Sequence, residues 1–323
     1  MRACLLAVVL AASLGLLQQA SAARANRAAA GACGQAASAP ASYRHVIWIW
    51  MENHPYDEII GSKDAPFTNR LAAECGLATN FHNITHPSLP NYIAATSGGT
   101  QGIRDDCQPS ECSRRVQSVF GQLQAAGKSW TAYQESMPAP CTLSSTSGTN
   151  PPGNYAPKHN PAVYYLPLRP GCGRRVVALG TPSAGAFARA LRARALARFS
   201  FITPNLCNDT HDCPVSTGDA WLSRWLHAIV ASATYRSERT VIFVTWDEGE
   251  GGSTDDCATN TSDRGCHIAT LVVSPSTPRG TRSAVLFNHY ALLKTTEQLL
   301  GIRTYLGHAR DASSRSMRSA FHL

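Results

Sequence analysis

Residues 45–53 carry the sequence HVIWIWMEN, a continuous apolar run with β-branched residues that ends abruptly in an acid and an amide. A strand that is apolar on both sides is typical of a parallel sheet with both faces covered by helices. The runs TVIFVTW at 240–246 and HIATLVV at 267–273 predict further strands of this kind. The stretch FSFIT at 199–203 predicts a shorter strand.

Helical segments alternate with these strands. Apolar periodicity and end signals predict helices over 67–75, 88–97, 116–126, 183–197, 219–235 and 287–300. Asp219 is expected to cap the N-terminus of the helix that it begins. The alternation predicts an α/β fold with a mostly parallel central sheet flanked by helices. Residues 136–173, dense in Pro, Gly, Ser and Asn, predict a long loop that crosses the mouth of a site.

The first residues have the features of a secretory signal peptide. Arg2 precedes an apolar segment at 5–17, and the small residues ASA at 20–22 form a cleavage site. A membrane anchor is the alternative, but this apolar segment is short for spanning a bilayer. We therefore expect residues 1–22 to be a signal peptide.

The rest of the chain is expected to be one domain behind a short leader. Residues 23–43 are rich in Ala, Ser and Gly and predict a flexible leader. The chain has 323 residues, of which 44% are hydrophobic and 15% charged, and these values suit one globular core. Residues 44–323 are therefore predicted to form a single domain.

The cysteines indicate an oxidising compartment. Eleven are present, and Cys4 lies in the expected signal peptide, which leaves an even number for disulfides. A zinc cluster is the alternative, but no CxxC pair occurs. The chain is thus expected to be secreted or periplasmic. The connectivity stays open, with short bridges expected for Cys107–Cys112, Cys207–Cys213 and Cys257–Cys266.

The formal charge of +8 favours anionic partners such as phosphates, anionic lipid surfaces or nucleic acid. The basic residues are scattered, and the densest group (Arg192, Arg194 and Arg198) fits the solvated face of a helix. We therefore expect general attraction to a phosphorylated small molecule or phosphoinositide, with at most peripheral contact with an anionic membrane. No nucleic-acid partner is expected, and the oligomeric state is left open.

Acidic and amide side chains follow two of the predicted strands. Glu52 and Asn53 come after the strand at 45–51, and Asp247 and Glu248 after the strand at 240–246. The polar stretch at 205–212 follows the strand at 199–203, and all three clusters are expected to meet at one edge of the sheet. In open α/β sheets, ligands bind at the carboxyl ends of the strands. Such oxygen ligands suit Mg²⁺, Ca²⁺ or Mn²⁺, and with histidines nearby they suit Zn²⁺. Turn formation is the alternative, but its repetition after two strands favours a metal site.

Ser88 precedes an apolar helix in the sequence HPSLPNY at 86–92. The N–H groups and the positive end of the helix dipole meet at such a position, which suits a phosphate or a serine alkoxide. A simple N-cap is the alternative for Ser88.

Five short motifs together resemble the bacterial phosphoesterase family, a branch of the alkaline phosphatase superfamily. They are EN at 52–53, PSLPNY at 87–92, KHNP at 158–161, DTHD at 209–212 and WDEG at 246–249. The resemblance extends from about residue 45 to about residue 301. The family includes secreted acid phosphatases, phosphatidylinositol 3-phosphatases and phospholipases C. An alkaline-phosphatase-like fold is implied.

The resemblance also implies roles for individual residues. Ser88 matches the nucleophile, and four positions match ligands of a divalent metal ion (Ca, Mg, Mn or Zn): Glu52, Asn53, Asp247 and Glu248. His159 and His211 match histidines that contact the phosphoryl group and are expected to be catalytic. Substrate contacts are expected at three positions, Asn53, His86 and His267, although the segment around His267 departs from the family spacing by one residue.

The reaction implied is hydrolysis of a phosphomonoester through a phosphoserine at Ser88. A phospholipase C-type phosphodiesterase is the first alternative, disfavoured because the chain is short and lacks the large C-terminal extension common in those enzymes. A secreted, non-catalytic phosphate- or lipid-binding protein is the second. A Ser-His-Asp hydrolase is a third, but no GxSxG motif occurs.

Overall fold

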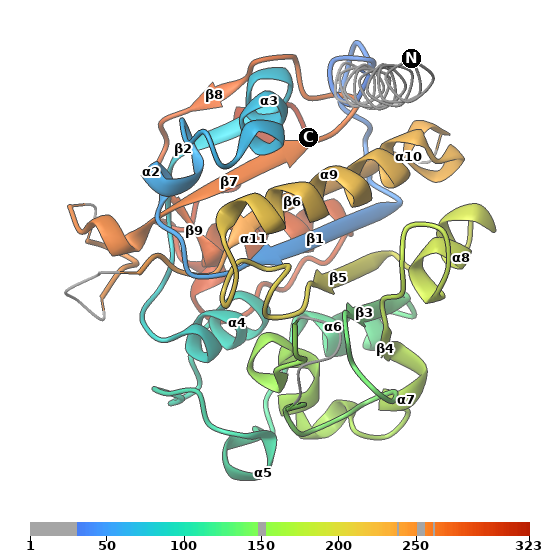
Figure 1. Ribbon diagram of the computed structural model, residues 1–323, viewed down its shortest axis with the longest axis vertical. Coiled ribbons are helices and arrows are strands. Elements are labelled where there is room, and N and C mark those ends of the chain that lie inside the picture. Colours follow the sequence, from blue (N-terminus) through green and yellow to red (C-terminus); the bar gives the residue numbers. More distant parts are fainter. Residues whose placement is uncertain (1–30, 148–152, 238, 251–255, 261) are drawn as a thin grey trace, which may run out of the picture.

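The apolar run at 45–51 forms the central strand of a nine-stranded sheet in the computed structural model (Figure 1). The model describes residues 31–147, 153–237, 239–250, 256–260 and 262–323, so the expected signal peptide lies outside the described residues. The strands are β1 (His45–Met51), β2 (Gly76–His82), β3 (Trp130–Gln134), β4 (Val176–Ala178), β5 (Phe199–Thr203), β6 (Thr240–Trp246), β7 (His267–Val273), β8 (Arg282–Ser283) and β9 (Phe287–Asn288).

The strand order is β4-β3-β5-β1-β6-β7-β2-β8, and β9 pairs with β2. Strand β7 runs antiparallel to both of its neighbours, β6 and β2, and the other pairings are parallel. The predicted mostly parallel sheet is therefore confirmed. Because β7 is reversed, its first residue, His267, lies at the same edge of the sheet as the carboxyl ends of β1 and β6.

Helices cover both faces of the sheet, with α9 in front of β1 and β6 and α11 behind them (Figure 1). The helices are α2 (Tyr56–Ile59), α3 (Pro66–Glu74), α4 (Ser88–Ser97), α5 (Pro109–Cys112), α6 (Val119–Ala125), α7 (Cys172–Arg175), α8 (Ala186–Arg192), α9 (Val215–Ala231), α10 (Ala233–Ser237), α11 (His289–Leu299) and α12 (Arg318–Phe321). The predicted helices 116–126 and 183–197 are thus shorter than expected, as α6 and α8.

Strand β1 is buried along its whole length, as its composition predicts. Trp48 donates a hydrogen bond of 2.9 Å to Thr296 of α11, and the ring of Trp50 lies 4.7 Å from that of Tyr92 of α4. On the opposite face, the methyl group of Met51 lies so close to α9 that a side chain at Gly218 would contact it at 3.0 Å. The apolar run therefore fixes helices on both faces.

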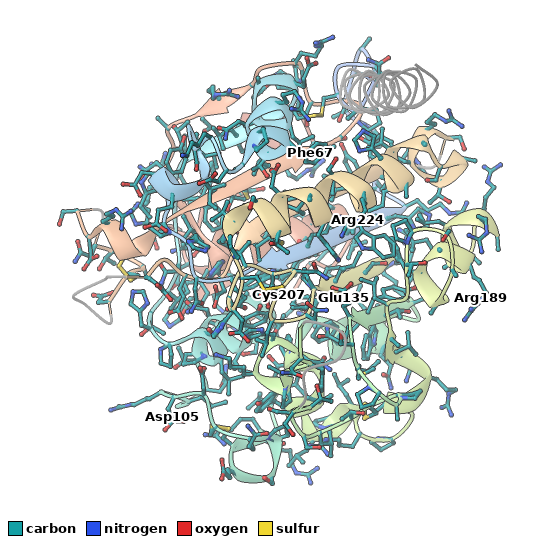
Figure 2. All side chains as sticks on the ribbon, viewed as in Figure 1. Phe67, Asp105, Glu135, Arg189, Cys207 and Arg224 are labelled. Carbon is teal, nitrogen blue, oxygen red and sulfur yellow. A yellow bond between two sulfur atoms is a disulfide. The ribbon has the colours of Figure 1, made fainter. Side chains whose placement is uncertain are left out.

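Asp219 corrects one prediction. The helix predicted from 219 begins earlier, as α9, and Asp219 lies within it. The Asp219 carboxylate accepts hydrogen bonds from the backbone N–H of Phe67 (2.9 Å) and of Thr68 (2.7 Å) and from the Thr68 hydroxyl (2.7 Å). It thus caps α3 instead of its own helix, at the point where Phe67 is labelled in Figure 2. The sequence indicates a capping acid, whereas packing of α9 on α3 decides which helix it caps.

Replacing Asp219 by alanine is expected to lower the free energy of unfolding by about 1–3 kcal/mol, because two buried N–H groups lose their acceptor. Urea unfolding followed by circular dichroism measures the change. Asp64→Ala is the matched control, since it removes the same charge from an exposed position just before α3. Equal midpoints for Asp219→Ala and the wild type would show that the cap contributes nothing.

Within the expected leader at 23–43, both ends of the segment 31–43 are attached to the domain, whereas the residues between them are mostly exposed. Cys33 forms a disulfide with Cys75 at the end of α3, and Ala32, Cys33 and Tyr43 are buried. The hydroxyl of Tyr43 also lies 2.7 Å from that of Ser276. A covalent link and buried side chains therefore outweigh the small-residue composition here. Residues 23–30 lie outside the described residues.

All ten cysteines that follow the expected signal peptide are paired. The three predicted short bridges are confirmed, and the remaining two join more distant residues: Cys107–Cys112, Cys207–Cys213, Cys257–Cys266, Cys33–Cys75 and Cys141–Cys172. Complete pairing fits an oxidising compartment. Among the described residues, no helix has the length and apolar character needed to cross a bilayer.

Candidate active site

The carboxyl ends of β1 and β6 bring the two predicted acidic pairs together. The strands are parallel neighbours with Met51 opposite Trp246, so the residues that follow them lie side by side. The backbone N–H of Asp247 donates to the carbonyl of Met51 at 3.0 Å. The backbone N–H of Asn53 donates to Oδ1 of Asp247 at 3.2 Å. The parallel register therefore sets the spacing of the acids.

Ser88 lies against these strand ends, and oxygen atoms surround its hydroxyl. Its Oγ is 3.1 Å from Oε2 of Glu52, 3.2 Å from Oε1 of Glu248 and 3.5 Å from Oδ1 of Asn53. A serine hydroxyl has one proton and can donate it to only one of the three. The excess of acceptors, two of them carboxylates, gives the site the oxygen donors that a cation requires.

The N-terminus of α4 is held from the loop that follows the helix. The backbone N–H of Leu89 donates to Oδ1 of Asp106 at 2.9 Å, and Oδ2 of Asp106 pairs with Nζ of Lys158 at 2.8 Å. The adjacent acid, Asp105, points away from the body of the molecule (Figure 2). Ser88 itself makes no capping bond, so its hydroxyl is directed at the acids rather than at its own helix.

Two residues without a role in the sequence interpretation complete the surroundings of Glu52. The hydroxyl of Tyr92, one helical turn after Ser88, donates to Oε1 of Glu52. The ring of Tyr92 stacks on that of His159, with centroids 5.4 Å apart. His159 lies between Glu52 (Nε2 to Oε2, 3.2 Å) and the second new residue, Asp209 (Nδ1 to Oδ2, 3.3 Å). The long loop thus brings His159 into the site through a short 3₁₀ helix, Pro157–His159.

Burial dominates the electrostatics of this cluster. Burial, with repulsion from neighbouring acids, raises the pKa of Glu52 well above its usual range. Burial likewise raises the pKa of Asp209 well above its usual range and that of Asp247 to about 8. Burial, followed by the charge of Lys158, lowers the pKa of His159 well below its usual value. Three desolvated carboxyl groups and a neutral imidazole are therefore close together.

The cluster fits a divalent cation. Among the described residues, ligand atoms of Glu52, His159 and Asp209 lie within 4.8 Å of one another. Three buried atoms also make no hydrogen bond: Nε2 of His159, Oδ2 of Asp209 and Oδ2 of Asp247. The contacts of 3.2 and 3.3 Å at the first two are close approaches without hydrogen-bond geometry. A cation would satisfy these atoms and offset the repulsion between the carboxylates. Glu52 belongs both to this set and to the predicted set with Asn53, Asp247 and Glu248.

Lys158 and His211 form a partly exposed side of the site. Nζ of Lys158 is 3.2 Å from Nε2 of His211, whose Nδ1 is 2.7 Å from Oδ1 of Asp212. The rings of His159 and His211 are 5.7 Å apart. Burial alone would lower the pKa of Lys158, but the charges of Glu52 and Asp106 raise it overall, so its ammonium group stays charged.

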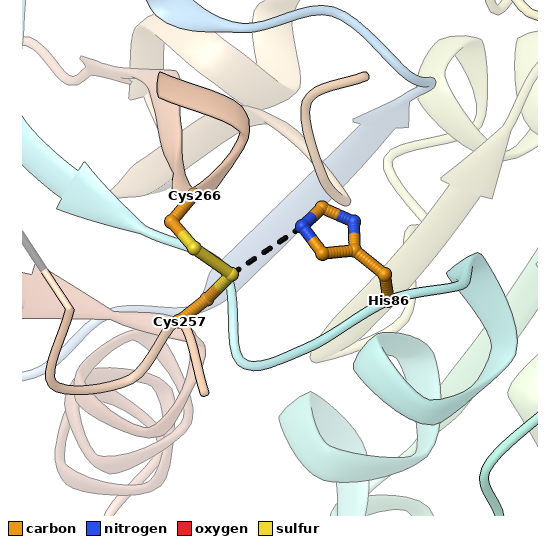
Figure 3. A group of neighbouring side chains, drawn as sticks. All are labelled: His86, Cys257 and Cys266. Carbon is orange, nitrogen blue, oxygen red and sulfur yellow. Dashed lines mark hydrogen bonds between the residues drawn. A yellow bond between two sulfur atoms is a disulfide. The ribbon is translucent and has the colours of Figure 1, made fainter. Parts of the chain in front are cut away.

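His86 lies beside the disulfide between Cys257 and Cys266 (Figure 3), and its ring also contacts Glu248. Its Nδ1 is 2.6 Å from Oε2 of Glu248, and its Nε2 is 3.4 Å from Sγ of Cys257, which is bonded to Cys266. Burial alone would lower the pKa of His86, but its hydrogen bond to Glu248 and the negative charge there raise it overall.

The disulfide loop is also attached to the segment that leads to Ser88. The backbone N–H of Cys257 donates to the carbonyl of Ile84 at 3.0 Å, and that of Asn83 to the carbonyl of Cys266 at 3.1 Å. These hydrogen bonds fix the position of His86 relative to the acids, and His86 in turn orients Glu248.

His267, a predicted substrate contact, lies apart from this cluster. Its ring stacks on Tyr56 with centroids 4.3 Å apart, and its Nε2 is 3.1 Å from the carbonyl of Thr79. In the part of the chain that the structure describes, none of the contacts recorded for His267 is with Ser88 or the acids. His289 lies beneath the acids, with Nε2 2.7 Å from the carbonyl of Asp247.

Sequence comparison gives relatives over most of the chain. The Phosphoesterase family profile matches residues 62–303. A phosphatidylinositol-3-phosphatase of Mycobacterium tuberculosis is 33% identical over 279 residues, covering 86% of this chain and 84% of that protein. An acid phosphatase of Aspergillus fumigatus is 26% identical, covering 81% of this chain and 56% of that protein. The chain thus spans little more than half of the fungal relative.

Solved structures show the same fold at low sequence identity. A protein of the alkaline phosphatase superfamily from Vibrio parahaemolyticus aligns with a TM-score of 0.59 at 12% identity, over 86% of this chain and 72% of that one. The lipoteichoic acid synthase LtaP from Listeria monocytogenes aligns with a TM-score of 0.58 at 12% identity, over 90% and 81%. The expected alkaline-phosphatase-like fold is confirmed, and with the profile match it shows that the chain belongs to the Phosphoesterase family.

Proposed function

We propose that the chain is a phosphomonoesterase in which Ser88 is the nucleophile and the surrounding acids hold a divalent cation. The observation that carries the proposal is the ring of oxygens around the Ser88 hydroxyl, with Glu52, Asn53 and Glu248 all within 3.5 Å. The relatives named phosphatidylinositol-3-phosphatase and acid phosphatase support a monoester substrate over the diester of a phospholipase C.

The cation would be held by residues already described: Glu52, Asn53, Asp247 and Glu248, with His159 and Asp209 as further donors. A bound divalent cation lowers the pKa of a nearby hydroxyl and neutralises charge on a phosphoryl group. The buried carboxyl groups fit this because they lie close together and, among the described residues, Oδ2 of Asp209 and Oδ2 of Asp247 accept no hydrogen bond.

Different side chains carry out the successive steps of the proposed reaction. Oγ of Ser88 attacks phosphorus in line, the bond from phosphorus to the alcohol oxygen breaks, and a phosphoserine forms. The Ser88 proton passes to Glu52 or Glu248, each within 3.2 Å of Oγ. Lys158 stabilises charge on the phosphoryl oxygens. When Lys158 turns from Nε2 of His211 to the phosphoryl group, that nitrogen can bind a proton and donate it to the leaving alcohol. Water then cleaves the phosphoserine, which releases phosphate and regenerates Ser88.

The substrate is proposed to be a phosphorylated organic molecule, with phosphoinositides among the candidates because of the mycobacterial relative. We also propose that the chain contacts anionic membranes, because its formal charge of +8 favours anionic surfaces. We place the activity after export, secreted or in the periplasm, because five disulfides need an oxidising compartment.

A phosphoester panel tests the proposal on the purified chain across pH, with and without a chelator. We expect hydrolysis of p-nitrophenyl phosphate, little hydrolysis of p-nitrophenylphosphorylcholine, loss of activity in EDTA and its recovery with an added divalent cation. Preference for the choline diester would favour the phospholipase C alternative. Cation binding without turnover of any ester would favour the binding-protein alternative. Activity that is insensitive to EDTA would refute the proposed dependence on a divalent cation.

A further inference from the structure

A cavity of about 730 Å³ lies next to the candidate active site. It is open to solvent and is lined by apolar and by polar side chains, among them Ile84, Ile103, Leu286 and Tyr290 together with Thr85 and Asn288. Binding sites for small organic molecules are typically about 300–1,000 Å³. The cavity is therefore far larger than a phosphate needs and has the size of an organic ligand site.

The cavity and the site meet at His86. His86 lines the cavity, while its Nδ1 bonds to Glu248 2.6 Å away beside Ser88. Arg104 lines it too, and two residues further on Asp106 accepts the backbone N–H of Leu89 at 2.9 Å. Because His86 belongs to both, a group that extends from a phosphate at Ser88 past His86 would enter the cavity.

The lining has one apolar region. Ile84 and Tyr290 form a small cluster with Ala94 of α4, separate from the main core, and Ala258 packs on it. Leu286 is 38% exposed, and the described residues include only one other large apolar side chain exposed to this degree, Leu143. Water-exposed apolar surface inside a concave site is surface that a ligand can cover favourably.

The charges around the cavity are mixed. The lining includes Arg104 as well as Asp256 and Asp311, with Nδ1 of His308 2.8 Å from Oδ2 of Asp311. This arrangement gives no excess of positive charge that would select a second phosphate. It suits a neutral group that offers an apolar surface and hydroxyls.

We propose that this cavity binds the alcohol portion of the phosphomonoester, so that the enzyme prefers esters of large, neutral alcohols with a ring or chain over esters of small ones. The inference rests on the proposed function and adds the leaving-group specificity. Among the candidate substrates it favours esters of neutral alcohols over phosphoinositides, whose alcohol portion carries an anionic phosphodiester. Leu286 and the apolar cluster contact the ring or chain of the alcohol. Thr85 and Asn288, which also line the cavity, bind its polar groups.

Leu286→Ser tests the proposal by removing apolar lining without disturbing the core. We expect kcat/KM for 1-naphthyl phosphate to fall about tenfold, which is typical for the loss of apolar contact in a pocket. For glycerol 2-phosphate kcat/KM should change less than about twofold, and so should inhibition by inorganic phosphate. Leu143→Ser is the matched control, because Leu143 is also 38% exposed but does not line the cavity.

Ala258→Trp is the second variant, since it fills the cavity from the partly exposed disulfide loop. It should weaken hydrolysis of the naphthyl ester more than Leu286→Ser does, with inhibition by inorganic phosphate retained as the sign of an intact site. If it does not fold, Leu286→Ser decides the question alone. Equal effects on both esters in Leu286→Ser, or the same effects in Leu143→Ser, would overturn the proposal.

Direct binding separates this inference from the proposed function. The alcohol 1-naphthol, followed by its fluorescence, should bind the wild-type protein and bind Leu286→Ser about tenfold more weakly. Neither measurement depends on turnover. Absence of 1-naphthol binding to a wild type that hydrolyses p-nitrophenyl phosphate refutes the cavity alone, whereas binding without hydrolysis of any ester refutes the phosphatase and keeps the cavity as a ligand site.

Discussion

Replacing Ser88 by alanine is expected to lower kcat/KM by about four orders of magnitude or more, because the atom that forms the covalent intermediate is removed. The fold should remain. Ser88 does not cap α4, and the N–H of Leu89 keeps its acceptor on Asp106 at 2.9 Å. The alanine also fits the space, since it is smaller than the buried serine. The melting temperature should therefore stay close to that of the wild type.

Initial rates on p-nitrophenyl phosphate and thermal unfolding by circular dichroism measure both parts of this expectation. Acid quenching during turnover of a ³²P-labelled ester should trap label on the wild type and none on Ser88→Ala. Ser97→Ala is the matched control, because Ser97 is buried on the same helix and bonds to the carbonyl of Ile93 at 2.8 Å, away from the acids. Near-normal turnover by Ser88→Ala would show that Ser88 is not the nucleophile.

Replacing Glu52 by glutamine is expected to change stability in opposite directions with and without a divalent cation. The Glu52 carboxyl group is completely buried near Asp209 and Asp247, which raises its pKa, so the chelated protein either buries a repelled charge or takes up a proton there. An amide avoids both costs and should raise the melting temperature by a few degrees. With the cation bound, the same charge is a ligand. The variant should then melt lower than the wild type and lose about a hundredfold or more in activity.

Thermal unfolding in EDTA and in excess Mg²⁺, Ca²⁺, Mn²⁺ or Zn²⁺ measures this reversal, and elemental analysis of the dialysed protein gives the bound metal. Glu297→Gln is the matched control. Glu297 is equally buried, on α11, and accepts the backbone N–H of Leu306 at 3.0 Å. Its replacement should shift the melting temperature equally in both conditions. An equal shift for Glu52→Gln would argue against a cation at Glu52.

The sequence predicts the parts of the site that depend on strands. The buried runs at 45–51 and 240–246 are long and apolar, and parallel pairing of neighbouring strands then places Glu52 beside Asp247. Ser88 and Tyr92 are four residues apart on a predicted helix and so share a face. That spacing could have identified Tyr92 as a neighbour of the site. Asp209 could have been identified from its place in the DTHD motif at 209–212.

Contacts made by loops could not be predicted in this way. Asp106 reaches Leu89 because the chain turns back after α4, and no periodic pattern records that turn. Asp219 caps α3 because two helices pack together. The expected role of His267 depends on a motif whose spacing differs here, and its position beside Tyr56 leaves that role a prediction.

The bond between Cys257 and Cys266 makes the chemistry at Ser88 dependent on where the chain is located. His86 contacts Cys257 on one side and Glu248 on the other, so a chain with free thiols would hold that acid less firmly. Glutathione and thioredoxin keep thiols reduced in the cytosol. Under the proposed function, a chain with free thiols at these two positions is expected to be a poorer catalyst than the oxidised chain.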